Sequence, residues 1–148
     1  MREIKFRGKS PCFNTWLYGD LVRVDGTTCI CEKGSMKMDG HHIRQFADKP
    51  QFVKEDTIGQ FTGIKDNKGN KIYEGDIIRF KYEDYSEYNY NGYHHPVEII
   101  SAVTFEWGCY RIDGYPCRLG DCCDWSEDDC EFEVIGNIYD NPDLLNNN

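Results

Sequence analysis

The chain has 148 residues and a formal net charge of −9, with 39% hydrophobic and 14% aromatic residues. This length fits one domain, or two small lobes that share a core. An acidic chain is a poor candidate for binding a phosphate backbone, and the sequence has no apolar run that could span a bilayer and no signal-peptide core after Met1. We therefore expect a cytoplasmic protein that binds neither nucleic acid directly nor a membrane.

The first third of the sequence predicts short strands joined by turns. Ile4 and Phe6 alternate with charged residues, which favours a half-buried strand that ends at Gly8. Asp25-Gly26 supplies the positive φ angles of a tight hairpin. Residues 33–50 are polar and contain two glycines, so they predict an irregular loop.

The sequence holds eight cysteines, which raises the question of disulfides or zinc. Cys29 and Cys31 fall in a strand-like run on one face and, with His41 and His42, are weak candidate zinc ligands. Packing explains the two cysteines equally well, and no structural zinc spacing is present here or in the second cluster at 117–130. Because no export signal is seen, we expect reduced thiols and predict no cofactor.

The central stretch, residues 57–80, joins two turns to the clearest strand. Asp66-Asn67-Lys68-Gly69 places an Asx-turn former first and a glycine fourth, which predicts a chain reversal at Gly69. A second structural turn is predicted at Gly75. In the strand that follows, Ile78 and Phe80 face one way and Arg79 the other.

A tyrosine-rich stretch follows at residues 82–93. Asn91-Gly92 between tyrosines is a strong hairpin signal, so we predict a protruding ribbon that turns at Gly92. Cross-strand aromatic pairing explains the tyrosines without a function. The alternative is a protein-binding patch, formed by Tyr85, Tyr88, Tyr90 and Tyr93.

The last third predicts two more strands. Residues 97–107 alternate over the longest period-two run in the chain, which favours a core strand that includes Trp107 and ends at Gly108. Residues 121–133 hold seven acids, but their spacing lacks the glycine turn of a calcium loop, so a solvated acidic loop is favoured. A closing strand at 132–139 precedes a helical turn, in which Asn141 is the expected N-cap.

Four blocks resemble the YopX family of small phage and prophage proteins. They are MREIKFRGK at 1–9, the W-x-YGDL pattern at 16–21, the central block at 57–80 and FEVIGNIYDNPDLL at 132–145. The sequence departs from the family pattern at 12–15, 82–93 and 109–130. The resemblance implies a phage-encoded, mainly β, self-associating protein of unassigned role, and it carries over no catalytic residue.

The turns and alternating runs together predict an all-β or β-dominated fold with one short C-terminal helical turn. We expect an N-terminal β region at 1–56 and an SH3-like small barrel within 57–148, as one unit with a shared core. Function is less determined. A non-enzymatic protein-interaction or self-assembling module is favoured, with a zinc-binding protein or metal-dependent enzyme using the cysteine and histidine clusters as the alternative.

The charge is unevenly distributed along the chain. Residues 1–81 hold 15 Lys and Arg against 11 Asp and Glu, whereas residues 82–148 hold 2 against 15. The acidic part is either a solvated surface that keeps the protein dispersed or one side of a complementary contact with the basic part of another copy. The expected partners are therefore the protein itself, as a homo-oligomer, and a host or phage protein.

Overall fold

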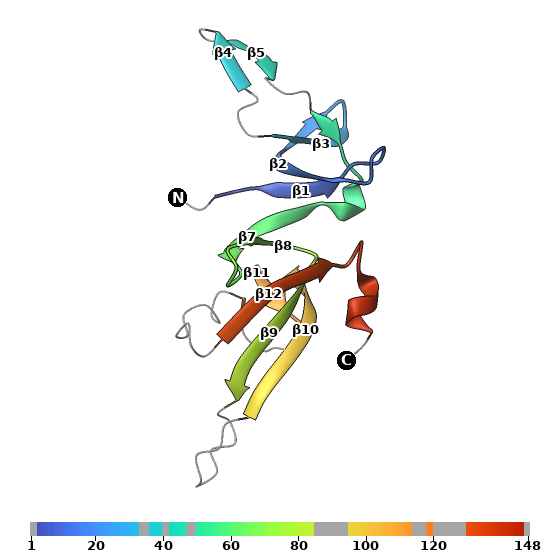
Figure 1. Ribbon diagram of the computed structural model, residues 1–148. Coiled ribbons are helices and arrows are strands. Elements are labelled where there is room, and N and C mark those ends of the chain that lie inside the picture. Colours follow the sequence, from blue (N-terminus) through green and yellow to red (C-terminus); the bar gives the residue numbers. More distant parts are fainter. Residues whose placement is uncertain are drawn as a thin grey trace. The chain divides into compact units, whose positions relative to one another are not determined.

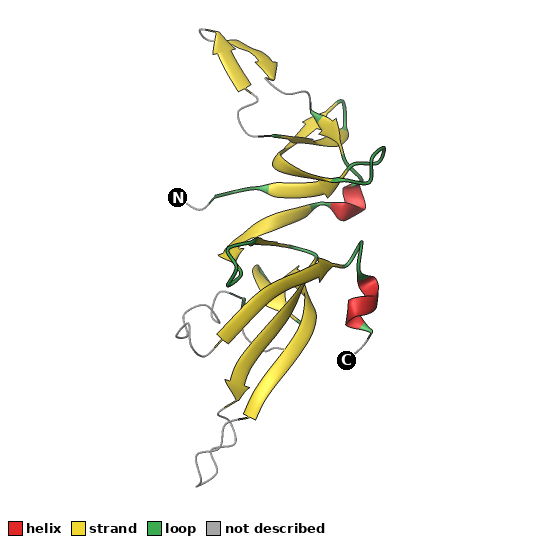
Figure 2. Cartoon of the chain, viewed as in Figure 1, coloured by secondary structure: helices red, strands yellow, loops and turns green. Residues whose placement is uncertain are grey.

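The computed structural model describes residues 3–32, 36–39, 42–46, 50–84, 95–113, 118–119 and 130–146. Strands dominate these residues, and two short 3-10 helices are drawn beside them in Figure 2, which confirms the prediction of a mainly β protein. The chain divides into two compact units, Met1–Gly63 (unit 1) and Ile64–Asn148 (unit 2). The division predicted after residue 56 stays a prediction. No helix in the described ranges is both long and apolar enough to cross a membrane.

Unit 1 is built around an antiparallel sheet whose order is β6-β3-β2-β1-β7, and β8 (Lys71–Tyr73) follows β7 in the hydrogen-bonded order (Figure 1). Strand β7 runs across the boundary between the units. The elements are β1 (Phe6–Lys9), β2 (Trp16–Val24), β3 (Thr27–Cys31), β4 (Met36–Asp39), β5 (His42–Phe46), β6 (Gln51–Phe52), η1 (Glu55–Thr57) and β7 (Gly59–Lys65).

Strand β2 serves two partners. Its first half, Trp16–Gly19, pairs with β1, and its second half, Asp20–Val24, pairs with β3. At the junction, a Cβ atom on Gly19 would lie 1.9 Å from the carbonyl oxygen of Cys31, so only glycine allows this approach. The β2–β3 turn has φ angles of 48° at Asp25 and 82° at Gly26, which confirms the predicted hairpin.

The burial predicted for the first strand is wrong. Ile4 is 62% exposed, whereas Arg7, expected on the solvent face, is buried, as is Lys9, the last residue of β1. The Arg7 guanidinium lies 4.7 Å from the centre of the Trp16 ring, and the Lys9 ammonium lies 5.9 Å from it. Long basic side chains bury their aliphatic stems readily when an aromatic face covers them, so their charge did not predict their position.

Residues 33–50 are also different from the prediction. Instead of an irregular loop, the described backbone forms the β4–β5 hairpin, with Asp39 paired with His42 (Figure 1). The two strands have four and five residues and contain a register shift between Lys37 and Met38. Such short, irregular strands produce little of the alternation by which strands are recognised.

Unit 2 contains a four-stranded antiparallel sheet with the order β11-β10-β9-β12. Phe80 lies at its centre and stacks on Phe132 and Tyr82, with ring centres 4.7 and 5.0 Å apart. The core around Phe80 also includes Ile72, Ile78, Val103, Ile112 and Leu119. The elements of unit 2 are β8 (Lys71–Tyr73), β9 (Asp76–Asp84), β10 (His95–Glu106), β11 (Cys109–Ile112), β12 (Cys130–Asn137) and η3 (Pro142–Leu145).

Two details of unit 2 bear on the predicted barrel and the predicted helical turn. Among the described strands, no pairing joins β11 to β12, so the SH3-like closure stays a prediction. The helical turn is present as η3, but the Asn141 side chain does not cap it. Its Oδ1 atom instead accepts a hydrogen bond from the Asn137 N–H at 3.4 Å, because the chain reverses tightly before η3.

Candidate functional site

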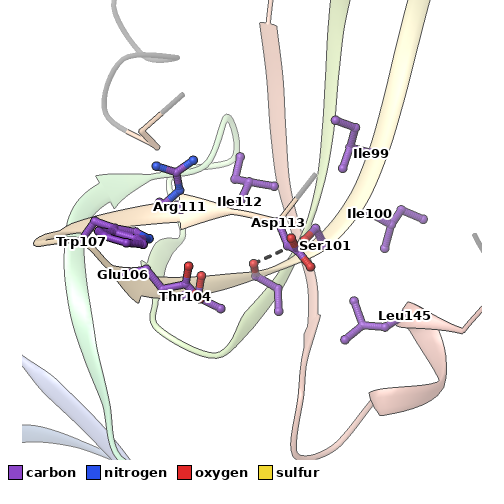
Figure 3. A pocket seen from close by; sticks show the side chains of 11 residues that line it. Ile99, Ile100, Ser101, Thr104, Glu106, Trp107, Arg111, Ile112, Asp113 and Leu145 are labelled. Atoms are coloured by element: carbon purple, nitrogen blue, oxygen red, sulfur yellow. Dashed lines mark hydrogen bonds between the residues drawn. The ribbon is translucent and has the colours of Figure 1, made fainter. Parts of the chain in front are cut away.

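A pocket of about 780 Å³ lies alongside β10 in unit 2 (Figure 3). This volume lies within the range of pockets that hold ligands or side chains of a partner. The lining is about equally apolar and polar. Its apolar residues are Ile99, Ile100, Ala102, Trp107, Ile112 and Leu145, and its polar residues are Ser101, Thr104, Glu106, Arg111 and Asp113.

Three elements position this lining. Strand β10 supplies residues from both of its faces, and β11 returns antiparallel to it, with Thr104 opposite Arg111 and Val103 opposite Ile112. The short helix η3 contributes Leu145. Figure 3 shows Trp107 and Leu145 at opposite ends of the pocket. The pocket is therefore an elongated surface along a strand.

Trp107 lies at the tip of the β10–β11 hairpin in an unusual conformation. Glu106 pairs with Cys109, so Trp107 and Gly108 form a two-residue turn, with φ angles of 54° and 79°. Glycine, asparagine and aspartate tolerate a positive φ angle, but a bulky residue such as tryptophan is strained there. The side chain is nevertheless 92% exposed, so packing within the chain does not compensate for the strain. Strained residues of this kind are concentrated at functional sites.

The prediction that Trp107 belongs to a core strand is therefore wrong. The alternation from residue 97 continues in register through Trp107, but β10 ends at Glu106 and the chain turns there. The dipeptide Trp107-Gly108 between two strand-like runs was the available signal, since a glycine at the second turn position favours a two-residue hairpin. Sequence reasoning missed this residue because tryptophan is rarely found at the first turn position.

The chemistry of the lining is that of a binding surface. Two carboxylates, on Glu106 and Asp113, and the guanidinium of Arg111 line the pocket together with its apolar residues. The buried Ser101 hydroxyl donates to the Ala102 carbonyl at 3.5 Å, and the described lining contains no histidine or lysine to act as its base. A lining that mixes apolar and charged groups is suited to contact with another protein surface.

In the central turn predicted from the sequence, the side chains of Asp66 and Asn67 make structural hydrogen bonds. The buried Asp66 carboxylate accepts from the backbone N–H groups of Lys68 at 3.0 Å, Asn70 at 2.7 Å and Val134 at 3.2 Å. The Asn67 Oδ1 atom accepts from the Phe132 N–H at 2.6 Å. Both side chains thus bind outward-facing N–H groups of β12, which would otherwise form an open sheet edge.

The two glycines of this stretch also have structural positions. Gly69 has φ 84° and donates its N–H to the Asp66 carbonyl at 2.9 Å. Gly75 has φ 80°, donates to the Val103 carbonyl at 2.8 Å and accepts from the Ile138 N–H at 2.9 Å. Asp76 accepts the Tyr73 N–H at 2.7 Å. The two hydrogen bonds of Gly75 connect its turn to β10 and to the residues after β12.

The candidate metal ligands are only partly within the described residues. Cys29 and Cys31 are buried in β3, and burial raises the pKa of the Cys29 thiol. The Cys29 Sγ atom donates to the Thr27 carbonyl at 3.8 Å. The backbone of His42 belongs to β5, while its side chain and His41 lie outside what the structure describes. Within the described ranges, no three histidine, cysteine, aspartate or glutamate side chains gather as metal ligands.

The tyrosine ribbon lies outside the described residues. Tyr85, Tyr88, Tyr90 and Tyr93, together with the turn predicted at Gly92, fall in residues 85–94. The protein-binding patch predicted there stays a prediction. The structure instead identifies the Trp107 turn and its pocket, on the same unit, as a candidate binding surface.

Comparisons with known proteins agree with the fold. No curated protein matches the chain significantly. A solved structure, the crystal structure of protein EF1440 from Enterococcus faecalis, matches with a TM-score of 0.55 at 19% identity, over 98% of this chain and 99% of the other, which shows a shared fold. A family profile described as YopX protein matches residues 5–146. Because this match covers nearly the whole chain, the protein belongs to the YopX family.

Proposed function

We propose that the protein is a phage-encoded, non-enzymatic interaction module that acts in the host cytoplasm and associates with copies of itself. A host or phage protein is the second class of partner. The observation that carries the proposal is Trp107, which combines a positive φ of 54° with 92% exposure beside a partly apolar pocket. Neither the strain nor the exposure benefits an isolated chain.

Both features have an explanation if Trp107 is buried on association. Tryptophan is enriched among the few interface residues that dominate binding energy, where it fills a desolvated site. The turn fixes the backbone of Trp107, so the backbone loses little conformational freedom on binding. The neighbouring pocket supplies apolar surface that is covered at the same time.

Replacing Trp107 by asparagine tests this role, because it separates folding from association. Asn-Gly is the preferred pair for a two-residue hairpin turn, so Trp107→Asn is expected to raise the thermal midpoint. Loss of an interface anchor is worth about 2 kcal/mol or more, so self-association should weaken by at least about tenfold. Sedimentation velocity across a concentration series measures the second effect, and thermal unfolding measures the first.

Trp107→Phe is the matched control, since it keeps an aromatic ring and the backbone strain. It should retain most of the association and none of the added stability. A wild-type protein that sediments as a monomer at tens of micromolar would refute self-association. Unchanged association of Trp107→Asn would instead remove Trp107 from the interface. Co-purification from a lysogenic or infected host, comparing wild type with Trp107→Asn, examines the second class of partner.

A further inference from the structure

We propose that the contact between copies is head-to-tail: Phe13 on unit 1 of one copy enters the pocket beside Trp107 on unit 2 of another. This inference rests on the proposed self-association and specifies its geometry. Two observations carry it, namely the unequal charge of the two units and the way in which residues 10–15 present an exposed aromatic ring.

The charge of the units opposes a symmetric contact through unit 2. Unit 1 has 10 Lys and Arg against 8 Asp and Glu, a net charge of +2, whereas unit 2 has 7 against 18, a net charge of −11. Two copies that met through unit 2 would bring together two bodies that each carry a net charge of −11, and like charges across an interface are unfavourable. A contact between unit 2 and unit 1 pairs opposite net charges instead.

Unit 1 offers a suitable projecting group at Phe13. Its side chain is 78% exposed, the largest exposure among the big hydrophobic residues described in this unit. The loop that carries it is closed by hydrogen bonds: Ser10 N–H to the Thr15 carbonyl at 2.8 Å, and Asn14 N–H to the Ser10 carbonyl at 3.1 Å. The Phe13 N–H also donates a hydrogen bond to the Ser10 hydroxyl oxygen, at 3.4 Å.

This arrangement lowers the entropy lost on binding. Asn14 has φ 55°, a conformation that asparagine tolerates better than most residues, so the loop reverses without glycine. A loop backbone that is already fixed in this way has little conformational freedom left to lose on binding. The projecting ring and the partly apolar pocket lie on different units, as a head-to-tail contact requires.

A head-to-tail contact uses two different surfaces of each copy. It therefore continues from copy to copy until a ring closes, or it forms an open chain. A symmetric contact uses one surface twice and stops at a dimer. The two arrangements respond differently when each surface is inactivated in a separate variant.

Mixing two variants exploits that difference. Phe13→Ser inactivates the projecting ring, and Trp107→Asn inactivates the pocket side. The buffer is reducing, so that the exposed Cys12 in the same loop cannot form disulfides between copies. Each variant alone should then sediment as a monomer at tens of micromolar. An equimolar mixture should form a one-to-one heterodimer, because the intact Phe13 of one variant meets the intact pocket of the other.

Two controls keep folding separate from association. Phe13 is largely exposed, so Phe13→Ser should leave the thermal midpoint nearly unchanged. Phe52 is also exposed on unit 1, in the edge strand β6, and Phe52→Ser should associate as the wild type does.

The outcomes distinguish this inference from the proposal on which it rests. Association of Phe13→Ser alone at the wild-type level would overturn the head-to-tail contact and leave self-association standing. Two monomeric variants that stay monomeric when mixed, beside a wild type that associates, would also overturn it. A monomeric wild type would refute both proposals, since there would be no contact to describe.

Discussion

Asp66 shows how one buried carboxylate organises a turn and a sheet edge. Burial alone would raise the pKa of Asp66, but hydrogen bonds from Asn70, Val134 and Lys68 outweigh it, so that the pKa is held below its ordinary value. A carboxyl group with a lowered pKa in the folded state stabilises the fold when it is ionised. The stabilisation is complete above the unfolded-state pKa of about 3.9 and is lost as the pH falls through the lower folded-state pKa.

Asp66→Asn is therefore expected to lower the free energy of unfolding at pH 7 by about 2–3 kcal/mol. The charge-assisted hydrogen bonds of the carboxylate are lost, and the new side-chain N–H₂ group points at backbone N–H donors instead of accepting from them. The difference from the wild type should shrink as the pH falls below about 4, because the carboxyl of the unfolded wild-type chain is protonated there and the folded carboxylate follows at its lower pKa. Urea denaturation at pH 7 and pH 3 measures both values. An equal difference at the two pH values would contradict this account, and Asp56→Asn, at an exposed position, serves as the control.

At the scale of elements, β2 determines the architecture of unit 1. It changes partner from β1 to β3 at Gly19, where the β2 backbone approaches that of Cys31. A side chain at this position would meet backbone atoms, which cannot rotate away as a side chain can. The sheet of unit 1 therefore depends on one residue that has no side chain.

Gly19→Ala should destabilise the protein by about 1–3 kcal/mol, the usual range for an overpacked site. The added Cβ would lie 1.9 Å from the Cys31 carbonyl oxygen and 2.5 Å from its carbon, so the strands must separate. Thermal unfolding and urea denaturation measure the loss. Gly26→Asn is the matched control: its φ of 82° suits asparagine, no atom lies within 4 Å, and stability should stay nearly constant. A stable Gly19→Ala variant would show that β2 does not need this approach.

At the scale of the whole molecule, the separation of charge between the units gives association an electrostatic component. Unit 2 carries a net charge of −11 and unit 1 a net charge of +2, and the proposed contact places unit 2 against unit 1 of a second copy. Exposed charges attract across such a contact only within about one Debye length, which is about 10 Å at 0.1 M salt and about 3 Å at 1 M.

Association of the wild-type protein should therefore weaken as salt rises from 0.1 to 1 M. Sedimentation velocity at the two concentrations measures the change in the dissociation constant. The part contributed by Trp107 and Phe13 is apolar and should persist at high salt. Stronger association at 1 M salt would mean that apolar burial alone holds the copies together, and that the charge of the units has no attractive role.

Local signals in the sequence determined the turns and the class of fold. Asp25-Gly26 and the Asp66 to Gly69 turn were predicted because a positive φ angle restricts the residue type at one position, whatever surrounds it. Alternation predicted the strand that carries Ile78 and Phe80, since one buried face of a strand imposes a period of two. These rules act within a few residues, so the sequence is sufficient for them.

The tertiary structure decided which surfaces are covered and which are presented. Asp66 binds Val134, 68 residues away, and no pattern near either residue shows that contact. Arg7 and Lys9 are buried because Trp16, on the neighbouring strand β2, covers their side chains. Trp107 is exposed because β10 ends at Glu106, the residue before it. The pocket arises from β10, β11 and η3 only after they pack. Burial is a property of the assembled neighbours of a residue, and it is therefore settled by packing between distant segments.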